Sequence, residues 1–235
     1  MRIWLVLAAL VSSANTFAMG LRSFVALPVE KGGAVIRLQV ERAEDSDTDR
    51  LLTSAAIGIS ARQTLLFGLP YRLSPAGEDR QGDVSALYRH MIWQDDSLSG
   101  TRRLGLLGGV VIPTERDRDG AIQAGAVFTF FRKRHEIDAD FLYQAGLDQR
   151  PDGGRYDLSW QYRLAPAVRP DWGVPAEVNS VVEVNGRWRE GANTTHQITL
   201  GLQWIHQRWV LEGGFVQDLN NAEETRYLIS TRWHF

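Results

Sequence analysis

The sequence predicts an all-β protein, an antiparallel transmembrane β-barrel of about 12 strands, within a range of about ten to fourteen. Three observations predict this fold. Segments of about ten residues with alternating polarity recur along the whole chain. The joints between them alternate between short ones and longer, charged ones. The last segment ends on an aromatic residue, Phe235.

The first 18 residues predict a secretory signal peptide. Met1 and Arg2 form a short positive region, residues 3–11 are apolar, and residues 12–18 are small and polar. The apolar run is too short to span a bilayer as a helix. Cleavage is expected after Ala18, with Ala14 as the alternative. We therefore expect a signal peptide over 1–18, a periplasmic segment over 19–33 and an outer-membrane barrel over 34–235.

Composition indicates one domain and excludes several protein classes. The 235 residues carry a net charge of -2, so the chain lacks the basic surface typical of nucleic-acid binding. It has no cysteine, which excludes a lipoprotein or a disulfide-linked scaffold. Beyond the leader, no run is long enough for a spanning helix, so any membrane crossing must use strands.

The predicted strands follow one another with few gaps. Segment 156–164 is the clearest, because Asp157, Ser159 and Gln161 alternate with Leu158 and Trp160. Segment 51–60 has the weakest alternation, since small residues occupy both of its faces. The twelve expected strands cover residues 34–42, 51–60, 63–72, 83–94, 102–113, 121–132, 135–146, 156–164, 176–188, 195–205, 208–218 and 225–235.

One face of these strands is predicted to contact lipid. The clearest sets are Leu104, Leu106, Val110 and Ile112; Ala124, Ala126, Phe128 and Phe130; Ile137, Ala139, Phe141 and Tyr143; and Ile198, Leu200, Leu202 and Trp204. Tryptophans fall towards strand ends, where an aromatic girdle at a membrane interface would place them.

The last strand carries the candidate assembly signal. Tyr227, Ile229, Trp233 and Phe235 share its apolar face, while Ser230, Arg232 and His234 lie on the other. Such an exposed aromatic edge would aggregate in a soluble protein, but it closes against the first strand in a barrel. The alternative, a soluble periplasmic β-sandwich, requires these aromatic side chains to be buried in a core.

The connections predict the orientation of the barrel. The charged connections are 41–50, 73–81, 113–120, 146–154, 189–195 and 218–225, and the short joints are 60–63, 132–135 and 206–208, with 95–102 and 165–176 as longer exceptions. Outer-membrane barrels have short periplasmic turns and longer outer loops. An even number of strands then places both ends of the barrel on the periplasmic side of a bacterial outer membrane.

A series of short motifs resembles a known family. The motifs lie at 67–72, 82–84, 108–114, 143–144, 156–163, 182–186, 200–203, 209–214 and 233–235. In this order they resemble the outer-membrane family named for the MetA pathway of phenol degradation, also described as transporters. Glu115 departs from the family pattern, which has Gly there. The resemblance implies an outer-membrane barrel and a connection with the degradation of aromatic compounds, without naming a solute.

Charged residues on the other face are candidates for the lumen. Those expected to contact a solute are Asp83, Arg89, Asp138, Asp140, Asp157, Arg163, Glu183, Arg187 and Glu212. Arg37, Gln39, Glu41, Arg226 and Arg232 share the polar face. Two interpretations are open: a polar conduit for a small solute, or an ionic network that plugs a narrow barrel. If the lumen is wet, Arg163→Ala leaves folding largely intact.

The expected function is an outer-membrane channel or transporter-like barrel for small solutes, aromatic or hydrophobic ones included. A structural or adhesion-type barrel with a plugged lumen is the first alternative. An outer-membrane hydrolase is the second, and it would need a Ser or Thr hydroxyl about 3 Å from His196. We expect no enzyme activity, cofactor, metal or nucleic-acid partner. The expected partners are the lipid bilayer, lipopolysaccharide, the barrel-assembly machinery and a small solute, with the chain as a monomer.

Overall fold

The computed structural model describes residues 20–235 except 78–79, 169–175 and 221–223, so the expected signal peptide lies outside the described residues. Twelve strands form one closed barrel. They are β1 (Ala34–Ala43), β2 (Thr48–Ser60), β3 (Gln63–Ser74), β4 (Val84–Ser97), β5 (Gly100–Ile112), β6 (Ala121–Arg132), β7 (His135–Gly146), β8 (Gly153–Ala165), β9 (Ala176–Arg189), β10 (Thr195–His206), β11 (Trp209–Asp218) and β12 (Thr225–His234).

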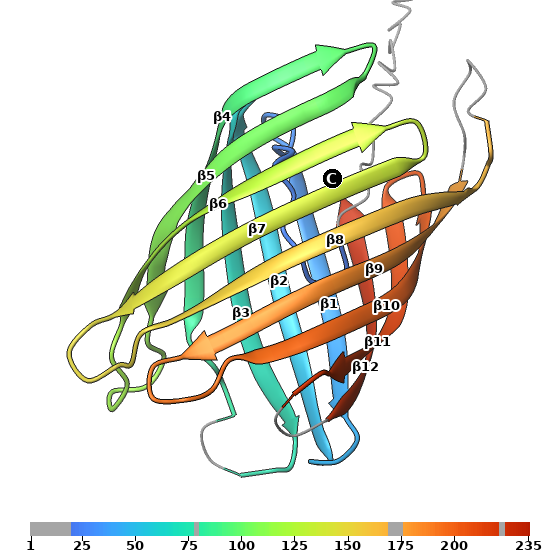
Figure 1. The fold of residues 1–235 in the computed structure, drawn as a ribbon. Coiled ribbons are helices and arrows are strands. Elements are labelled where there is room, and N and C mark those ends of the chain that lie inside the picture. Colours follow the sequence, from blue (N-terminus) through green and yellow to red (C-terminus); the bar gives the residue numbers. More distant parts are fainter. Residues whose placement is uncertain (1–19, 78–79, 169–175, 221–223) are drawn as a thin grey trace, which may run out of the picture.

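Each strand pairs antiparallel with its neighbours in the chain, and β1 closes the barrel against β12 (Figure 1). In this closure Val35 lies opposite His234 and Ala43 lies opposite Arg226. The predicted all-β fold and strand count are therefore confirmed. Closure leaves the last strand with a partner on both sides, which removes the exposed edge that a barrel must avoid. Among the described residues, no helix is long and apolar enough to cross a bilayer.

The connections divide the barrel into two ends. Residues 61–62, 133–134 and 207–208 form tight turns at one end, which we call the turn end. The connections between β4 and β5 and between β8 and β9, the two expected exceptions, also lie at the turn end, while the remaining connections lie at the other, the loop end, in the lower part of Figure 1. The expected exception over 95–102 is mostly strand, because β4 and β5 extend to Ser97 and Gly100. The barrel begins and ends at the turn end, where the amide of Phe235 donates to the Ala34 carbonyl at 2.8 Å.

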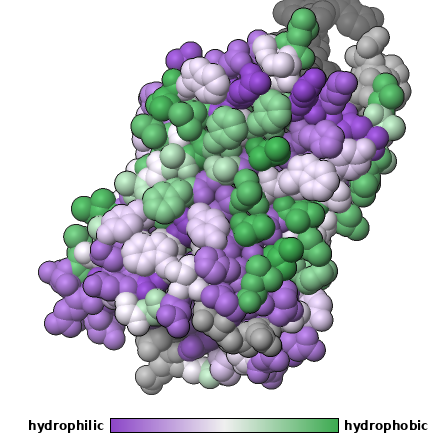
Figure 2. Space-filling model, viewed as in Figure 1, coloured by the Kyte–Doolittle hydropathy of each residue, from purple (hydrophilic) through white to green (hydrophobic). Residues whose placement is uncertain are grey.

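Side chains alternate between the interior and the outer surface. Leu106 and Leu202 are about half exposed on the outer face, as predicted, and so are Ile122 and Leu158. Figure 2 shows hydrophobic and aromatic side chains over the strands, with hydrophilic ones gathered at the lower left, among the loops. Tyr227, Ile229, Trp233 and Phe235, the candidate assembly signal, are all exposed on this face.

Aromatic residues mark both ends of the barrel. Trp160, Trp204 and Trp209 lie near the turn end, and Trp204 and Trp209 meet edge to face with ring centroids 5.7 Å apart. Tyr143 and Trp188 lie near the loop end, with centroids 5.9 Å apart. Two aromatic bands separated by an apolar surface are typical of a barrel that crosses a bilayer.

Two irregularities interrupt the ladder on one side. The β3–β4 ladder covers only Gln63–Gly68 of β3, since Pro70 has no amide proton to continue it. Beyond this point the amide of Gly82 donates to the Pro70 carbonyl at 2.8 Å. In β4 a bulge at Ile92 shifts the register, so Ile92 and Trp93 are both exposed on the outer face.

Candidate functional site in the barrel lumen

The lumen has an apolar half and a polar half. Inward residues of β1–β7 form an apolar belt, which we define as Val35, Ala56, Leu66, Leu87, Leu107, Val127 and Leu142. Most of the buried inward residues of β7–β12 are polar, among them Asp138, Asp157, Glu183, Gln203 and Glu212, although Val181, Val216 and Leu228 form an apolar patch on the same strands. Because neighbouring strands carry matching residues, each half is continuous: Val35 pairs with Ala56, and Leu66 pairs with Leu87.

The predicted lumen residues point inward from five of the strands, β4, β7, β8, β9 and β11, or lie at the rim. Those buried on inward faces are Arg89, Asp138, Asp140, Asp157, Arg163, Glu183 and Glu212, and Arg187 is partly exposed beside them. Asp83 differs, because it precedes β4 at the loop end. The polar half thus brings together most of the acidic candidates, while Arg89 lies in the apolar half beside Leu87.

The chain before β1 occupies the lumen. Residues 19–33 are expected to be a periplasmic segment, but residues 20–29 run inside the barrel, where Leu21, Val25 and Ala26 are almost fully buried, and residues 30–32 are exposed where the segment joins β1. The blue trace in Figure 1 lies among the strands rather than outside them. We call residues 20–33 the lumen segment. It enters at the turn end, where the amide of Gly32 donates to the Gly58 carbonyl at 2.9 Å.

Backbone amides of the lumen segment bind the polar half. Glu183 accepts the amides of Arg22 and Ser23, at 3.0 and 3.4 Å. Asp140 accepts the amide of Phe24 at 2.7 Å. Further along, Thr129 accepts the amide of Ala26 at 2.8 Å, and Thr64 accepts that of Val29 at 3.1 Å. An extended segment buried without a sheet partner needs such acceptors, because unpaired buried amides are costly.

Apolar contacts position the segment as well. Leu21 is fully buried against Val181, Val216 and Leu228. The socket depends on glycine: a Cβ on Gly201 would lie 2.5 Å from the Leu21 side chain. At the turn end, a Cβ on Gly58 would lie 1.9 Å from the Glu30 carbonyl oxygen. The barrel wall is therefore shaped to accommodate the lumen segment at both of its ends.

Ion pairs fill much of the polar half. Glu212 binds Arg232 at 2.5 Å and Arg37 at 2.8 Å, and it also accepts the Ser230 hydroxyl. On the opposite side of the polar half, Asp157 binds Arg187 at 2.7 Å. Arg155 lies 3.7 Å from Asp140 and 4.0 Å from the centre of the Phe24 ring, so it joins the lumen segment to this second cluster.

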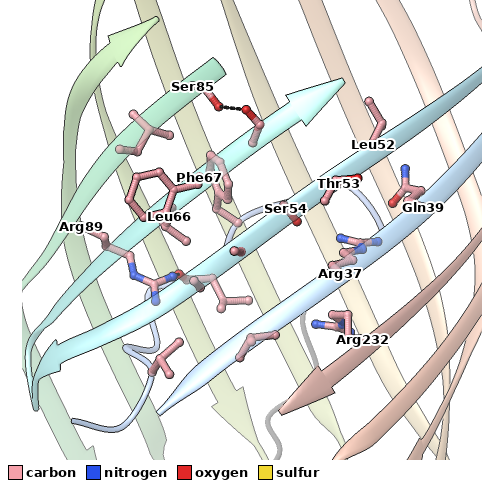
Figure 3. A pocket seen from close by; sticks show the side chains of 18 of the residues that line it. Arg37, Gln39, Leu52, Thr53, Ser54, Leu66, Phe67, Ser85, Arg89 and Arg232 are labelled. Atoms are coloured by element: carbon pink, nitrogen blue, oxygen red, sulfur yellow. Dashed lines mark hydrogen bonds between the residues drawn. The ribbon is translucent and has the colours of Figure 1, made fainter. Parts of the chain in front are cut away.

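An inner cavity of about 470 Å³ remains between the lumen segment and the wall formed by β1–β4. Figure 3 shows Arg89 on one side of this cavity and Arg37 with Arg232 on the other. Leu52, Leu66 and Leu87 contribute apolar surface to its wall. The described residues that line it include six arginines, at positions 22, 37, 89, 155, 187 and 232, but only two acidic residues, Glu30 and Glu41.

A second cavity of about 630 Å³ lies at the loop end. We call it the vestibule. It is lined by loop residues such as Arg118 and Arg150 together with strand residues such as Gln123. Arg155 and Arg187 line both cavities and so separate the vestibule from the inner cavity.

Asp83 organises the vestibule rather than the lumen. It accepts hydrogen bonds from Arg150 at 2.6 Å and from Arg118 at 3.2 Å. Partial burial by itself would raise the pKa of Asp83, but the two arginines outweigh burial and hold this pKa below its ordinary value. The carboxylate is therefore charged at neutral pH and links three loops. The prediction that Asp83 lies on an inward strand face was wrong, because Asp83 lies in the loop before β4.

The hydrolase alternative requires a Ser or Thr hydroxyl next to the His196 ring, but a tyrosine hydroxyl lies there. Nδ1 of His196 lies 2.7 Å from the Tyr156 hydroxyl, and the His196 backbone amide donates to Asn220. A tyrosine in this position does not supply the Ser or Thr hydroxyl that the alternative requires.

The sequence motifs missed the lumen segment, because it has neither a period of two nor a charge run. Several of its contacts are with strands more than 100 residues away, such as Glu183 for Arg22. One available signal was the string of inward glycines, including Gly58 and Gly201, in strands that otherwise carry side chains on both faces. Glycine in a strand interior often marks close approach of another backbone.

No protein-family model matches the chain, and no curated protein matches it. Solved structures do resemble it. The COG4313 outer membrane channel from Pseudomonas putida F1 matches with a TM-score of 0.60 and 13% identity, over 89% of this chain and 98% of that one. KdgM porin in complex with disordered oligogalacturonate matches with a TM-score of 0.58 and 8% identity, over 86% and 99%. The chain thus has the fold of outer-membrane channel barrels.

Proposed function

We propose that this protein is an outer-membrane channel for small solutes, and that the lumen segment is its plug. The observation that carries the proposal is the pair of cavities in one closed barrel, separated by Arg155 and Arg187. A solute would pass from the vestibule between these arginines into the inner cavity. The lumen segment then blocks the way to the turn end.

The outer surface supports the membrane location. Its apolar side chains and two aromatic bands suit a bilayer, and barrels with this fold include outer-membrane channels. The proposal includes the expected signal peptide, a bacterial outer-membrane location and insertion through the C-terminal strand. The turn end would face the periplasm, so the plug would be held from the periplasmic side.

The solute is proposed to contact the arginine-rich inner cavity rather than the acidic candidates. Glu183, Asp140 and Glu212 already bind the lumen segment or arginines in the closed state. An aromatic or hydrophobic solute, as the family resemblance implies, would find apolar contact on Leu66 and Leu87 of the belt.

A disulfide tether tests the plug. The 2.8 Å bond between the Ala26 amide and the Thr129 side chain places these two backbones within the range that a disulfide spans. Ala26→Cys with Thr129→Cys should therefore hold the segment when oxidised and release it when reduced. We expect discrete single-channel conductance in a planar bilayer that rises when the tether is reduced. The natural chain has no cysteine, so it is the matched control for the reductant itself.

A permanently closed barrel is the second candidate, since buried pairs such as Arg232–Glu212 and the seated segment both favour it. Heat-modifiable, folded protein without conductance in either redox state would contradict the channel and support this candidate. Conductance that is equal in both redox states would contradict the plug alone.

A further inference from the structure

Arg89 differs from the other arginines around the inner cavity. It is 2% exposed, and its NH1 donates to the Val25 carbonyl at 2.5 Å, while NH2 donates to the Thr64 hydroxyl at 3.3 Å. Its Nε has no hydrogen-bond partner among the described residues. No described carboxylate lies within 4.0 Å of it, whereas Arg37, Arg187 and Arg232 each have one.

The surroundings of Arg89 make this arrangement unusual. Its strand neighbours Leu87 and Met91 are buried, and Leu66 and Leu107 belong to the apolar belt around it. Gly105, which lies beneath its side chain, leaves room for the aliphatic part of Arg89 at 3.6 Å. A buried cation in apolar surroundings is costly unless an anion compensates it. Neutral oxygens from Val25 and Thr64 supply only part of that compensation.

The cavity next to Arg89 has the size and polarity of a small-molecule site. Its volume of about 470 Å³ falls within the range usual for ligand pockets. Six arginines and two glutamates are among its described lining residues, and Arg37, Arg187 and Arg232 are paired with Glu212 or Asp157, so Arg89 is the lining arginine whose charge no described carboxylate compensates. Leu52, Leu66 and Leu87 give one wall apolar surface, and Figure 3 shows Leu52 and Leu66 on this wall together with Thr53 and Ser54. Charge and apolar surface meet at Arg89.

We propose that the inner cavity binds a small apolar monocarboxylate, an aromatic or short aliphatic acid, with its carboxylate on Arg89. The guanidinium fork binds a carboxylate through two parallel hydrogen bonds, which would use the terminal nitrogens NH1 and NH2 that bind Val25 and Thr64 in the closed state. The apolar part of the ligand contacts Leu66 and Leu87. This inference rests on the proposed function, because it names the solute class of the same lumen.

Occupation of the site has a consequence for the lumen segment. The ligand carboxylate takes the place of the Val25 carbonyl on NH1, so binding removes one of the contacts that hold the segment. Ligand and seated segment therefore compete for the same donor, and each weakens the other by the same factor.

Binding can be measured without any transport. We would titrate the folded protein in detergent with benzoate by calorimetry, and repeat the titration with benzamide, which has the same shape without the charge. Benzoate should bind about 10- to 100-fold more tightly than benzamide. Arg89→Gln should abolish this preference and Arg89→Lys should retain part of it. Arg132→Gln, which removes an exposed arginine at the end of β6, should leave it unchanged.

Equal affinity for benzoate and benzamide in the natural protein would overturn the proposal, whether or not the Arg89 variants fold. So would a benzoate preference that survives Arg89→Gln. This test can fail independently of the channel proposal. Conductance without selective benzoate binding would contradict the carboxylate site and still support the channel. Selective benzoate binding without conductance would support the carboxylate site and contradict the channel.

Discussion

Leu21→Ala should loosen the lumen segment while the barrel stays intact. Leu21 is fully buried in the socket of Val181, Val216 and Leu228, which all belong to the wall. Burial of a leucine side chain contributes about 1.5–3 kcal/mol, and truncation in a packed site costs about 2–5 kcal/mol. We take about 2–3 kcal/mol for a contact between segment and wall. The ratio of released to seated segment should then rise about 30- to 150-fold.

Hydrogen–deuterium exchange measures this ratio. The amides of Phe24 and Ala26 donate to Asp140 and Thr129, so they exchange only when the segment leaves those acceptors. Exchange in residues 20–33 should therefore accelerate by the same factor in Leu21→Ala. The ladder amides of β9 to β12 should keep their natural rates, since their bonds remain in place.

Leu202→Ala is the matched control. Leu202 is on β10, next to Gly201 of the socket, but it is 54% exposed on the outer face. Its truncation should change exchange in the lumen segment by about twofold at most. Unchanged exchange in residues 20–33 of Leu21→Ala would refute the socket. Equal acceleration in the segment and in β9 to β12 would show that Leu21 stabilises the whole barrel, and would refute independent release.

Three further predictions concern the wall and the rim. Arg163→Ala should lower the free energy of unfolding by about 3–5 kcal/mol in a urea titration, because Arg163 is 8% exposed and 3.8 Å from Glu177; a loss under about 1 kcal/mol would support the wet lumen of the sequence analysis instead. Phe235→Asp should reduce heat-modifiable protein in isolated outer membranes, since it puts a charge on the exposed aromatic face, and normal insertion would count against the assembly signal. Because the pKa of Asp83 is lowered on folding, its loop contacts stabilise the folded state fully above the unfolded pKa of about 3.9 and are lost as the pH falls through the lower pKa of the folded state. Exchange of residues 113–120 should therefore rise in acid, and Asp83→Asn should remove this rise.

The strands could be predicted because the barrel imposes one rule on every residue. In β8, Asp157, Ser159 and Gln161 are buried while Leu158 and Trp160 are exposed. The alternation of polar and apolar residues in the sequence predicts this alternation of buried and exposed side chains. The rule weakens in β3, where Leu66 faces the apolar belt and Phe67 the outer surface. Because β3 carries apolar residues on both its inward and its outward face, its sequence alone does not indicate which side of the lumen is apolar. That division follows from comparing inward positions across strands rather than within one.

The site was harder to predict, because the polarity of a residue indicates whether its side chain points inward or outward but does not indicate which residue it will bind. Glu183 was correctly placed on the inward face, yet nothing near it in sequence indicates that it binds the amides of Arg22 and Ser23. Arg89 likewise looks like any lumen arginine until its neighbours Leu66 and Leu87 are known. Local patterns carry a period of two, whereas a backbone segment seated across the lumen depends on contacts between distant strands.

The contacts between the lumen segment and the barrel wall favour a plug that can leave the lumen. Glu183 and Asp140 hold the lumen segment through backbone amides, and water can replace an amide at a carboxylate with little net loss. By contrast, Arg232 and Glu212 bind each other within the wall and would stay paired when the segment leaves. Water cannot replace the apolar contacts, which are Leu21 in its socket and Ala26, Phe24 and Val29 on the apolar belt. Leu21 is the largest fully buried side chain among them and lies at the inner end of the segment, so its truncation should separate an opened barrel from an unfolded one.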